Sequence, residues 1–187
     1  SKQIFDREAL LGVSITGWMN NPNVLFDKKV LKKGAQIVKD VNKEVAEIIG
    51  INPAARTTCV KPSGNASVLL QTASGIHAEH SPMYIRNVQM NKESEITQAI
   101  IQSNPYMVEE SVWSAGGTDV VVSFPILPKK GSYYKDDLLG IDHLELVKKA
   151  QQNWVVAGTN EELCADEGIR HNVSNTIIVD DWDRVCL

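Results

Sequence analysis

A long amphipathic pattern over residues 27–50 sets the architecture expected of this chain. Asp27 suits the N-cap of a helix, Gly50 suits its end, and apolar residues recur between them at spacings of three and four. A helix with one apolar face has to bury that face against another layer of structure, so the pattern predicts a layered fold. The apolar positions are Val30, Leu31, Ile37, Val38, Val41, Val45, Ile48 and Ile49.

Short apolar runs supply the predicted second layer. Turn-bounded or alternating runs predict strands, and the continuous valines near residue 120 predict burial on both faces of one strand. We therefore expect an α/β fold with about five mainly parallel strands and helices packed over them, as a single domain over residues 1–187. The predicted strands are 10–17, 57–60, 84–90, 118–126 and 171–179, and further helices are expected near 67–71, 93–102, 142–156 and 180–185.

Composition narrows the functional classes. A net charge of −4 with scattered Lys and Arg argues against nucleic acid as the main partner. No apolar run reaches the ~20 residues of a membrane span, and no signal peptide is evident. The three widely spaced cysteines form neither a disulfide framework nor a CxxC pair, which favours a reducing, cytoplasmic setting. The chain begins with Ser and stops at "DRVCL", so we expect a piece of a longer polypeptide.

The most informative turn is "VKPSGNAS", residues 60–67. Pro62 ends the preceding strand, and Gly64 permits a close approach that a Cβ would hinder. Polar residues then open a helix whose first N–H groups lack intrahelical partners. Free amides, hydroxyls and the positive end of a helix dipole suit a phosphate. The candidate phosphate-binding residues are Ser63, Gly64, Asn65, Ala66 and Ser67.

The same residues are compatible with an ordinary capped helix that binds nothing. The turn is not a Walker loop, because the GxxxxGK[ST] spacing is missing. Polar residues on two strands line a ligand pocket or, more commonly, satisfy internal hydrogen bonds. These residues are Ser14, Thr16, Asn172 and Ser174.

Other reactive side chains carry weaker signals. His77 and His80 are three residues apart, but no third ligand of suitable spacing accompanies them, so we expect no metal. Arg86 lies in an apolar strand and requires either an internal carboxylate or an anionic ligand as its partner. Cys59 is expected to be a small buried hydrophobe, and the acidic neighbours of Cys164 disfavour a thiolate. No catalytic residue is assigned.

Several segments, taken in order, resemble the adenosylcobalamin-dependent (class II) ribonucleotide reductases. "TTCVKPSGNASVLL" resembles the strand, Lys-Pro-Ser-Gly-Thr turn and helix of that family, and "SGIHAEHSPMYIRNVQ" resembles the segment after it. "GVSITG" resembles a preceding barrel strand, while "QQNWVVAGT" and "HNVSNTIIV" resemble later elements. The resemblance spans about residues 10–185.

The resemblance implies the C-terminal part of a ten-stranded α/β barrel built from two five-stranded halves. It implies that Ser63, Gly64, Asn65, Ala66 and Ser67 hold the phosphates of a ribonucleoside di- or triphosphate. In the complete enzyme it implies adenosylcobalamin as cofactor and a cysteine thiyl radical that reduces the ribonucleotide to a deoxyribonucleotide. A half-barrel exposes strand edges and an apolar face, which predicts either pairing with the missing half or self-association.

The chain also departs from the family pattern. Asn65 and Asn87 replace a Thr and an Arg, and no Asn-x-Cys-x-Glu element with the radical cysteine occurs. We therefore expect no reductase activity from this polypeptide alone. The alternatives are a stand-alone, non-catalytic α/β domain that binds a phosphorylated small molecule, and a different radical enzyme that shares the barrel.

Overall fold

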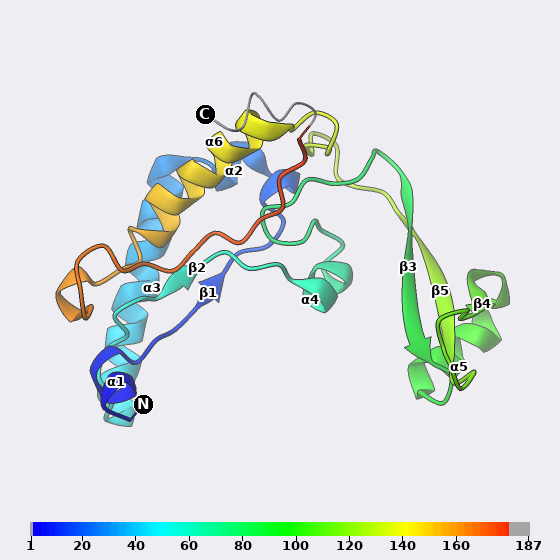
Figure 1. Cartoon of the computed structure of the whole chain (residues 1–187), viewed down its shortest axis with the longest axis horizontal. Coiled ribbons are helices and arrows are strands. Elements are labelled where there is room, and N and C mark those ends of the chain that lie inside the picture. Colours follow the sequence, from blue (N-terminus) through cyan, green and yellow to red (C-terminus); the bar gives the residue numbers. More distant parts are fainter. Residues whose placement is uncertain (1, 180–187) are drawn as a thin grey trace. The chain divides into compact units, whose positions relative to one another are not determined.

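The computed structural model describes residues 2–179, without the side chains of Phe5 and Asn65. The helix expected over residues 180–185 lies outside the described residues. Two compact units are present: one comprises residues 2–80 and 129–179, the other Ser81–Pro128. Figure 1 shows the path of the chain through the helices α1 Lys2–Glu8, α2 Pro22–Leu25, α3 Lys28–Ile49, α4 Gly64–Leu69, α5 Glu95–Ser103 and α6 Gly140–Ala150, and the strands β1 Val13–Ser14, β2 Thr58–Cys59, β3 Tyr84–Asn91, β4 Val108–Glu110 and β5 Asp119–Ile126.

The helix predicted after Asp27 is confirmed as α3. The Asp27 side chain accepts hydrogen bonds from the amides of Lys29 and Val30, and Gly50 ends the helix in the left-handed region at φ 74°. The helix predicted over residues 142–156 is also present, as α6 and a π-helical turn at Gln151–Val155 that continues it. This π-helical turn packs against both α3 and β2.

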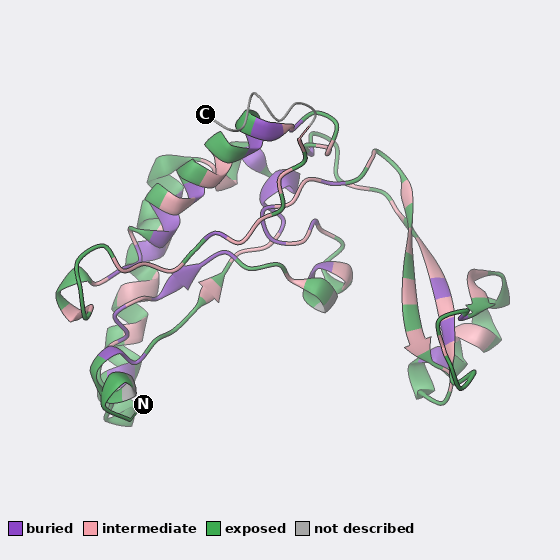
Figure 2. Ribbon diagram, in the orientation of Figure 1, coloured by how far each residue is buried: buried purple, intermediate pink, exposed green. Residues whose placement is uncertain are grey.

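The core of the larger unit lies between α3, the π-helical turn and β2. Trp154 is buried there; its indole N–H donates to the Cys59 carbonyl at 3.0 Å, and its ring lies 3.3 Å from where a Cβ on Gly34 would be. The core cluster comprises Trp18, Met19, Leu31, Ala35, Val60, Ile76, Leu138, Ala150, Trp154, Val155 and Val173. Figure 2 shows that much of the rest of α3 is exposed.

The expectation of five mainly parallel strands is not confirmed. β1 and β2 pair in parallel over only two residues each, and the segment predicted as a strand at 171–179 contributes one parallel bridge, Val60 to Val173. Polar residues and glycines interrupt these apolar runs. Only short stretches of each run therefore form the paired hydrogen bonds of a sheet, and side-chain contacts fix the remaining residues.

The smaller unit contains an antiparallel sheet in the order β3–β5–β4. The strands predicted at 84–90 and 118–126 are confirmed as β3 and β5, paired from Tyr84–Ile126 to Asn91–Asp119. The prediction that β5 is buried on both faces is wrong: Val120 and Val122 are buried, whereas Val121 between them is only half-buried. An antiparallel sheet buries one face, and alternate residues point to it.

An ion-pair cluster connects α1 to the segment before β2. The Glu8 carboxylate is buried and accepts from Arg7 and Arg56, both at 2.8 Å. The hydrogen bond from Arg7, followed by that from Arg56, lowers the pKa of Glu8, against the opposing effect of burial. Among the described residues, no helix is long and apolar enough to cross a membrane.

Candidate functional site

The candidate site is the turn between β2 and α4. Lys61 and Pro62 are exposed, Ser63 occupies the N-cap position, and α4 begins at Gly64. The Ser63 side chain does not cap its own helix. The helix predicted near residues 67–71 therefore starts earlier than expected, so the small residues Gly64 and Ala66 belong to its first turn.

Two serine hydroxyls hold the backbone of this turn. The amide of Lys61 donates to Ser14 Oγ at 3.0 Å, and the amide of Ser63 donates to Ser74 Oγ at 2.9 Å. Ser14 belongs to β1 and Ser74 to the loop after α4, so segments distant in sequence fix the turn from two sides. Of the two interpretations left open for Ser14, a ligand pocket or an internal hydrogen bond, this contact agrees with the internal hydrogen bond.

The Thr16 hydroxyl makes three hydrogen bonds beside Ser63. Its Oγ1 donates to the Ala73 carbonyl at 2.9 Å, accepts from the Gly75 amide at 2.9 Å and lies 2.6 Å from Ser63 Oγ. A hydroxyl has one proton to donate. Because Thr16 gives that proton to Ala73, the Ser63 hydroxyl is the donor in the contact between the two, and the lone pairs of Ser63 Oγ are left to accept.

The backbone of the loop after α4 approaches the turn closely at Gly75, whereas the sequence predicts such an approach at Gly64. A Cβ on Gly75 would lie 2.8 Å from the Lys61 carbonyl oxygen, and the residue has φ +56°. A Cβ on Gly64 would meet no atom within 4 Å. The tight contact between the loop and the turn thus depends on a residue that the sequence pattern did not single out.

The first turn of α4 presents backbone donors at an exposed surface. The Ser67 amide donates to the Ser63 carbonyl at 3.2 Å, which is the first helical bond, so the amides of Gly64, Asn65 and Ala66 precede the hydrogen-bonded ladder. Gly64 and Ala66 are exposed. Ser67 is different, because its hydroxyl is buried and its single proton is shared between the carbonyls of Ser63 and Gly64.

The later pair of polar strand residues, Asn172 and Ser174, contacts the end of β2 through main-chain atoms. The Val60 amide donates to the Asn172 carbonyl at 3.2 Å, and the Ser174 amide donates to the Val60 carbonyl at 2.8 Å. The Asn172 side chain is exposed. These two residues therefore extend the sheet beside the turn.

The histidines serve the loop that supports the turn. His77 Nδ1 donates to the Ser74 carbonyl at 2.8 Å, and the buried His143 donates from Nε2 to the Ile76 carbonyl at 3.1 Å. Burial lowers the pKa of His143, opposed by that hydrogen bond, with nearby His77 also lowering it. Among residues 2–179, no three His, Cys, Asp or Glu side chains gather as a metal site.

Arg86 finds its partner within its own strand. Its guanidinium donates to the Tyr84 hydroxyl at 3.2 Å and lies 5.9 Å from the centroid of the Tyr84 ring. The sequence predicts a carboxylate or an anionic ligand as its partner; among the described residues its side chain contacts the neutral Tyr84 phenol, and the anionic ligand stays a prediction. The sequence signal was present in "YIR", since residues i and i+2 of a strand share one face.

Neither described cysteine is activated. Cys59 is buried, and burial raises the pKa of its thiol, as expected for a small apolar residue. Burial also raises the pKa of Cys164, with Glu8 and Glu161 acting in the same direction against Arg56 and Arg170. Both thiols therefore remain protonated near neutral pH.

Sequence reasoning missed a buried polar cluster centred on Asn20. The Asn20 amide nitrogen donates to Glu79 at 2.7 Å and to Ser132 at 3.1 Å, and its oxygen accepts from the Thr72 hydroxyl and the Ala73 amide. Both Asn20 and Glu79 are buried. In "HAEH" the glutamate lies between an alanine and a histidine in a segment without apolar periodicity, so no local pattern marks it as internal.

The fold defines this chain as an α/β protein related in structure to the class II ribonucleotide reductases. A crystal structure of a B12-dependent (class II) ribonucleotide reductase superimposes with a TM-score of 0.65 at 16% identity, over 82% of this chain and 26% of that one. No protein-family model matches the chain.

Curated relatives point the same way. The chain is 28% identical over 121 residues to a probable adenosylcobalamin-dependent ribonucleoside-triphosphate reductase of Dictyostelium discoideum, covering 65% of this chain and 16% of the relative. It is 24% identical over 157 residues to the adenosylcobalamin-dependent ribonucleoside-triphosphate reductase of Euglena gracilis, covering 82% and 21% respectively. The resemblance inferred from sequence is confirmed for a partial region, because the chain spans only 16% and 21% of these two relatives.

Proposed function

We propose that this chain supplies the substrate phosphate-binding turn and neighbouring barrel strands of a ribonucleotide reductase. In this role the turn formed by Ser63, Gly64, Asn65, Ala66 and Ser67 binds the phosphates of a ribonucleoside di- or triphosphate, and the buried Ser67 hydroxyl supports the turn from within. The observation that carries the proposal is the exposed first turn of α4, fastened by Ser14, Thr16 and Ser74 while its first amides precede the helical ladder. Such amides bind anions without further reorganisation.

The residues of the turn divide into two roles. The amides of Gly64, Asn65 and Ala66 donate to phosphate oxygens, and the positive end of the short helix adds to the attraction. Ser67 fixes the shape of the turn through its bonds to Ser63 and Gly64. When a phosphate accepts the Ser63 proton, Thr16 redirects its own proton from the Ala73 carbonyl to Ser63 Oγ.

Reductive chemistry requires polypeptide beyond this chain. The sequence contains no Asn-x-Cys-x-Glu element. We assign the thiyl-radical cysteine to the missing part of the barrel, which pairs with this chain in the complete enzyme. This chain then positions the ribose against the radical and excludes water.

The apolar cavity beside α3 does not fit adenosylcobalamin. The cavity beside α3 has a volume of about 470 Å³ and is lined by aliphatic side chains with Asn42 as its polar member, which does not suit a corrin rimmed by amides. No step is therefore assigned to the cofactor through this chain. In the complete enzyme adenosylcobalamin would generate the radical.

The direct test compares two variants at Gly64. Gly64→Pro removes one N–H while Pro remains acceptable at the first position of a helix. Gly64→Ala keeps the N–H and adds a Cβ where no atom lies within 4 Å. We expect Gly64→Pro to weaken binding of inorganic triphosphate and of nucleoside triphosphate by about tenfold, and Gly64→Ala to leave both unchanged, as measured by calorimetry. Equal binding by both variants would contradict the phosphate turn.

A second variant tests the role of Thr16. Thr16→Val removes the hydroxyl that holds Ser63 Oγ, the Ala73 carbonyl and the Gly75 amide, whereas Thr16→Ser keeps it. We expect Thr16→Val to weaken triphosphate binding by about fivefold or more and Thr16→Ser to restore it, since a hydrogen bond contributes about 1 kcal/mol. If wild type binds triphosphate but Thr16→Val binds as tightly, the hydroxyl network does not position the site.

Activity separates the reductase from a stand-alone binding domain. The purified chain with adenosylcobalamin and a dithiol should produce no deoxyribonucleotide. Adding a polypeptide that carries Asn-x-Cys-x-Glu and the rest of the barrel should generate activity that Gly64→Pro lowers. Triphosphate binding without complementation by any such polypeptide would favour the non-catalytic domain.

A further inference from the structure

The apolar face of α3 is left largely uncovered. Ile37 is 53% exposed, Val41 51% and Ile48 75%, although these residues belong to the stripe that the sequence predicts to be internal. Leu31, Ala35 and Ala46 on the adjoining face are the buried ones. A soluble chain rarely leaves a contiguous stripe of large aliphatic residues in water without a partner.

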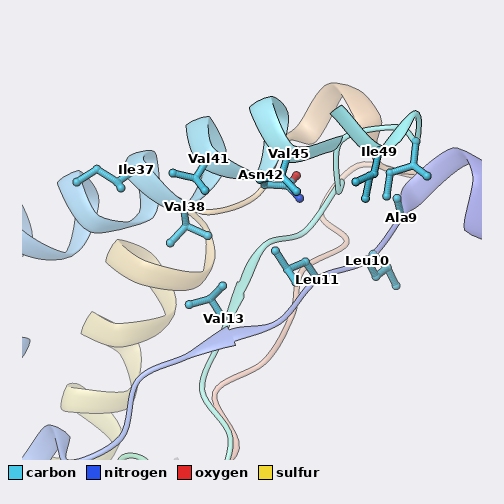
Figure 3. A pocket seen from close by; sticks show the side chains of 11 residues that line it. Ala9, Leu10, Leu11, Val13, Ile37, Val38, Val41, Asn42, Val45 and Ile49 are labelled. Carbon is cyan, nitrogen blue, oxygen red and sulfur yellow. The ribbon is translucent and has the colours of Figure 1, made fainter. Parts of the chain in front are cut away.

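The stripe borders an apolar cavity. As Figure 3 shows, Val38, Val41 and Val45 of α3 stand across from Leu11 and Val13 of the first extended segment. The cavity has a volume of about 470 Å³. All of these residues belong to the larger unit, so this surface is defined within one compact body.

The charges beside the stripe are arranged unfavourably for an isolated helix. Lys29 and Lys33 are four residues apart near the N-terminus, and Glu44 and Glu47 are three apart near the C-terminus. Like charges at these spacings repel, and both pairs have the wrong sign for the helix dipole. The ion pairs among the described residues include none of these four side chains, and all four are exposed.

An antiparallel second copy of α3 relieves both mismatches. With 3.6 residues per turn, Lys29, Lys33, Glu44 and Glu47 border the same side of the exposed stripe. A two-fold axis normal to the helix pair brings that side against itself in the opposite direction. Lys33 of one copy then meets Glu44 of the other, and Lys29 meets Glu47. The same register places Val30 against Ile48 and Ile37 against Val41, all of them exposed in the single chain.

We propose that α3 is a homodimerisation surface, on which a second copy of this chain packs antiparallel through the stripe Val30–Ile37–Val41–Ile48. The occupant is a second copy because the charge pattern is self-complementary under a two-fold axis. The cavity beside Val45 gives room for aliphatic side chains of the second copy. The inference does not depend on phosphate binding.

Sedimentation equilibrium of the whole chain over a wide concentration range tests the proposal. We expect a saturable monomer–dimer equilibrium, and Val41→Asp should raise the dimer dissociation constant by about tenfold or more because it places charges in the apolar seam. Val41 is already half exposed in the single chain, so circular dichroism of the variant should match wild type. A monomer at all concentrations, or open-ended aggregation, would overturn the proposal.

Charge reversal identifies the register. Lys33→Glu should weaken the dimer by about tenfold, since symmetry places two repulsive contacts where two attractive ones were. The double variant Lys33→Glu with Glu44→Lys should restore it. Lys32→Glu, an equal charge change on the side of α3 away from the stripe, is the matched control and should change the constant less than about twofold. A dimer that Lys33→Glu and Lys32→Glu weaken equally would rule out the antiparallel pairing.

Discussion

The two sheets of this protein are held by different means. β3 and β5 pair over eight residues each within the continuous segment Ser81–Pro128, so a long ladder of backbone hydrogen bonds joins neighbouring parts of the chain. β1 and β2 pair over two residues each, and hydroxyls and a tryptophan from distant segments complete their surroundings. A short ladder between distant segments depends on close side-chain fits, because few backbone bonds offset the entropy of closing the loop.

The largest expected effect breaks one of those fits. A Cβ on Gly158 would lie 2.0 Å from Thr58 Oγ1 and 2.6 Å from Thr58 Cγ2, in the buried core beside β2. Thr58 cannot simply turn away, because its hydroxyl donates to the Trp154 carbonyl at 2.6 Å. We expect Gly158→Ala to lower the free energy of unfolding by about 3 kcal/mol, measured by urea denaturation followed through tryptophan fluorescence.

Gly116 in the smaller unit provides the control for that variant. A Cβ there would lie 3.7 Å from Thr118 Cγ2, an ordinary contact. Gly116→Ala should change the free energy of unfolding by less than about 0.5 kcal/mol. If Gly158→Ala lowered the free energy of unfolding equally little, the residues around β2 would be able to move aside for the added Cβ. The contrast between the two sheets would then be wrong.

The same contrast explains what the sequence could predict. The amphipathic pattern of α3, its Asp27 cap and its Gly50 end are local signals, and so is the alternation in Tyr84–Asn91; each of these predictions is confirmed. The runs near residues 10–17 and 171–179 carry equally apolar residues, yet they form only fragments of ladder. Whether an apolar run pairs depends on partners distant in sequence, and no local pattern encodes them.

The candidate site shows the same limit. The turn follows from Pro62, Ser63 and Gly64, but α4 starts earlier than the sequence predicts, and the residues that hold the turn come from elsewhere. Ser14 and Thr16 were identified as polar residues in an apolar strand, without their partners, and Gly75 was not identified at all. Its importance comes from the approach of the Lys61 carbonyl, which only the folded chain creates.

An intermediate effect tests the one-sided burial of β5. Val122 is fully buried and Val121 is half-buried, although they are chemically identical neighbours. Val122→Ala should lower the free energy of unfolding of the smaller unit by about 2 kcal/mol, whereas Val121→Ala should cost less than about 1 kcal/mol. Hydrogen exchange of the β3 and β5 amides measures this unit directly. Equal losses would mean that a second layer covers the other face of the sheet, as the run of valines first suggested.

The smallest expected effect is a pH dependence confined to the larger unit. Burial lowers the pKa of His143 below the ordinary 6.5, so the folded state favours the neutral ring while the unfolded chain takes up the proton. The contribution to stability is complete above pH 6.5 and is lost as the pH falls from there through the lowered pKa of the folded state. The pKa of Glu8 is also lowered, from 4.5, so its contribution disappears only in a more acidic range. The two groups can therefore be separated by titration.

His143→Gln keeps a donor for the Ile76 carbonyl and removes the proton uptake, so the slope of unfolding free energy against pH just below 6.5 should flatten in this variant. The effect is small because one proton is involved and the bond to Ile76 partly offsets the burial. An unchanged slope would show that His143 becomes protonated without loss of the folded loop, and that the support of the turn by residues 72–77 is looser than its hydrogen bonds indicate.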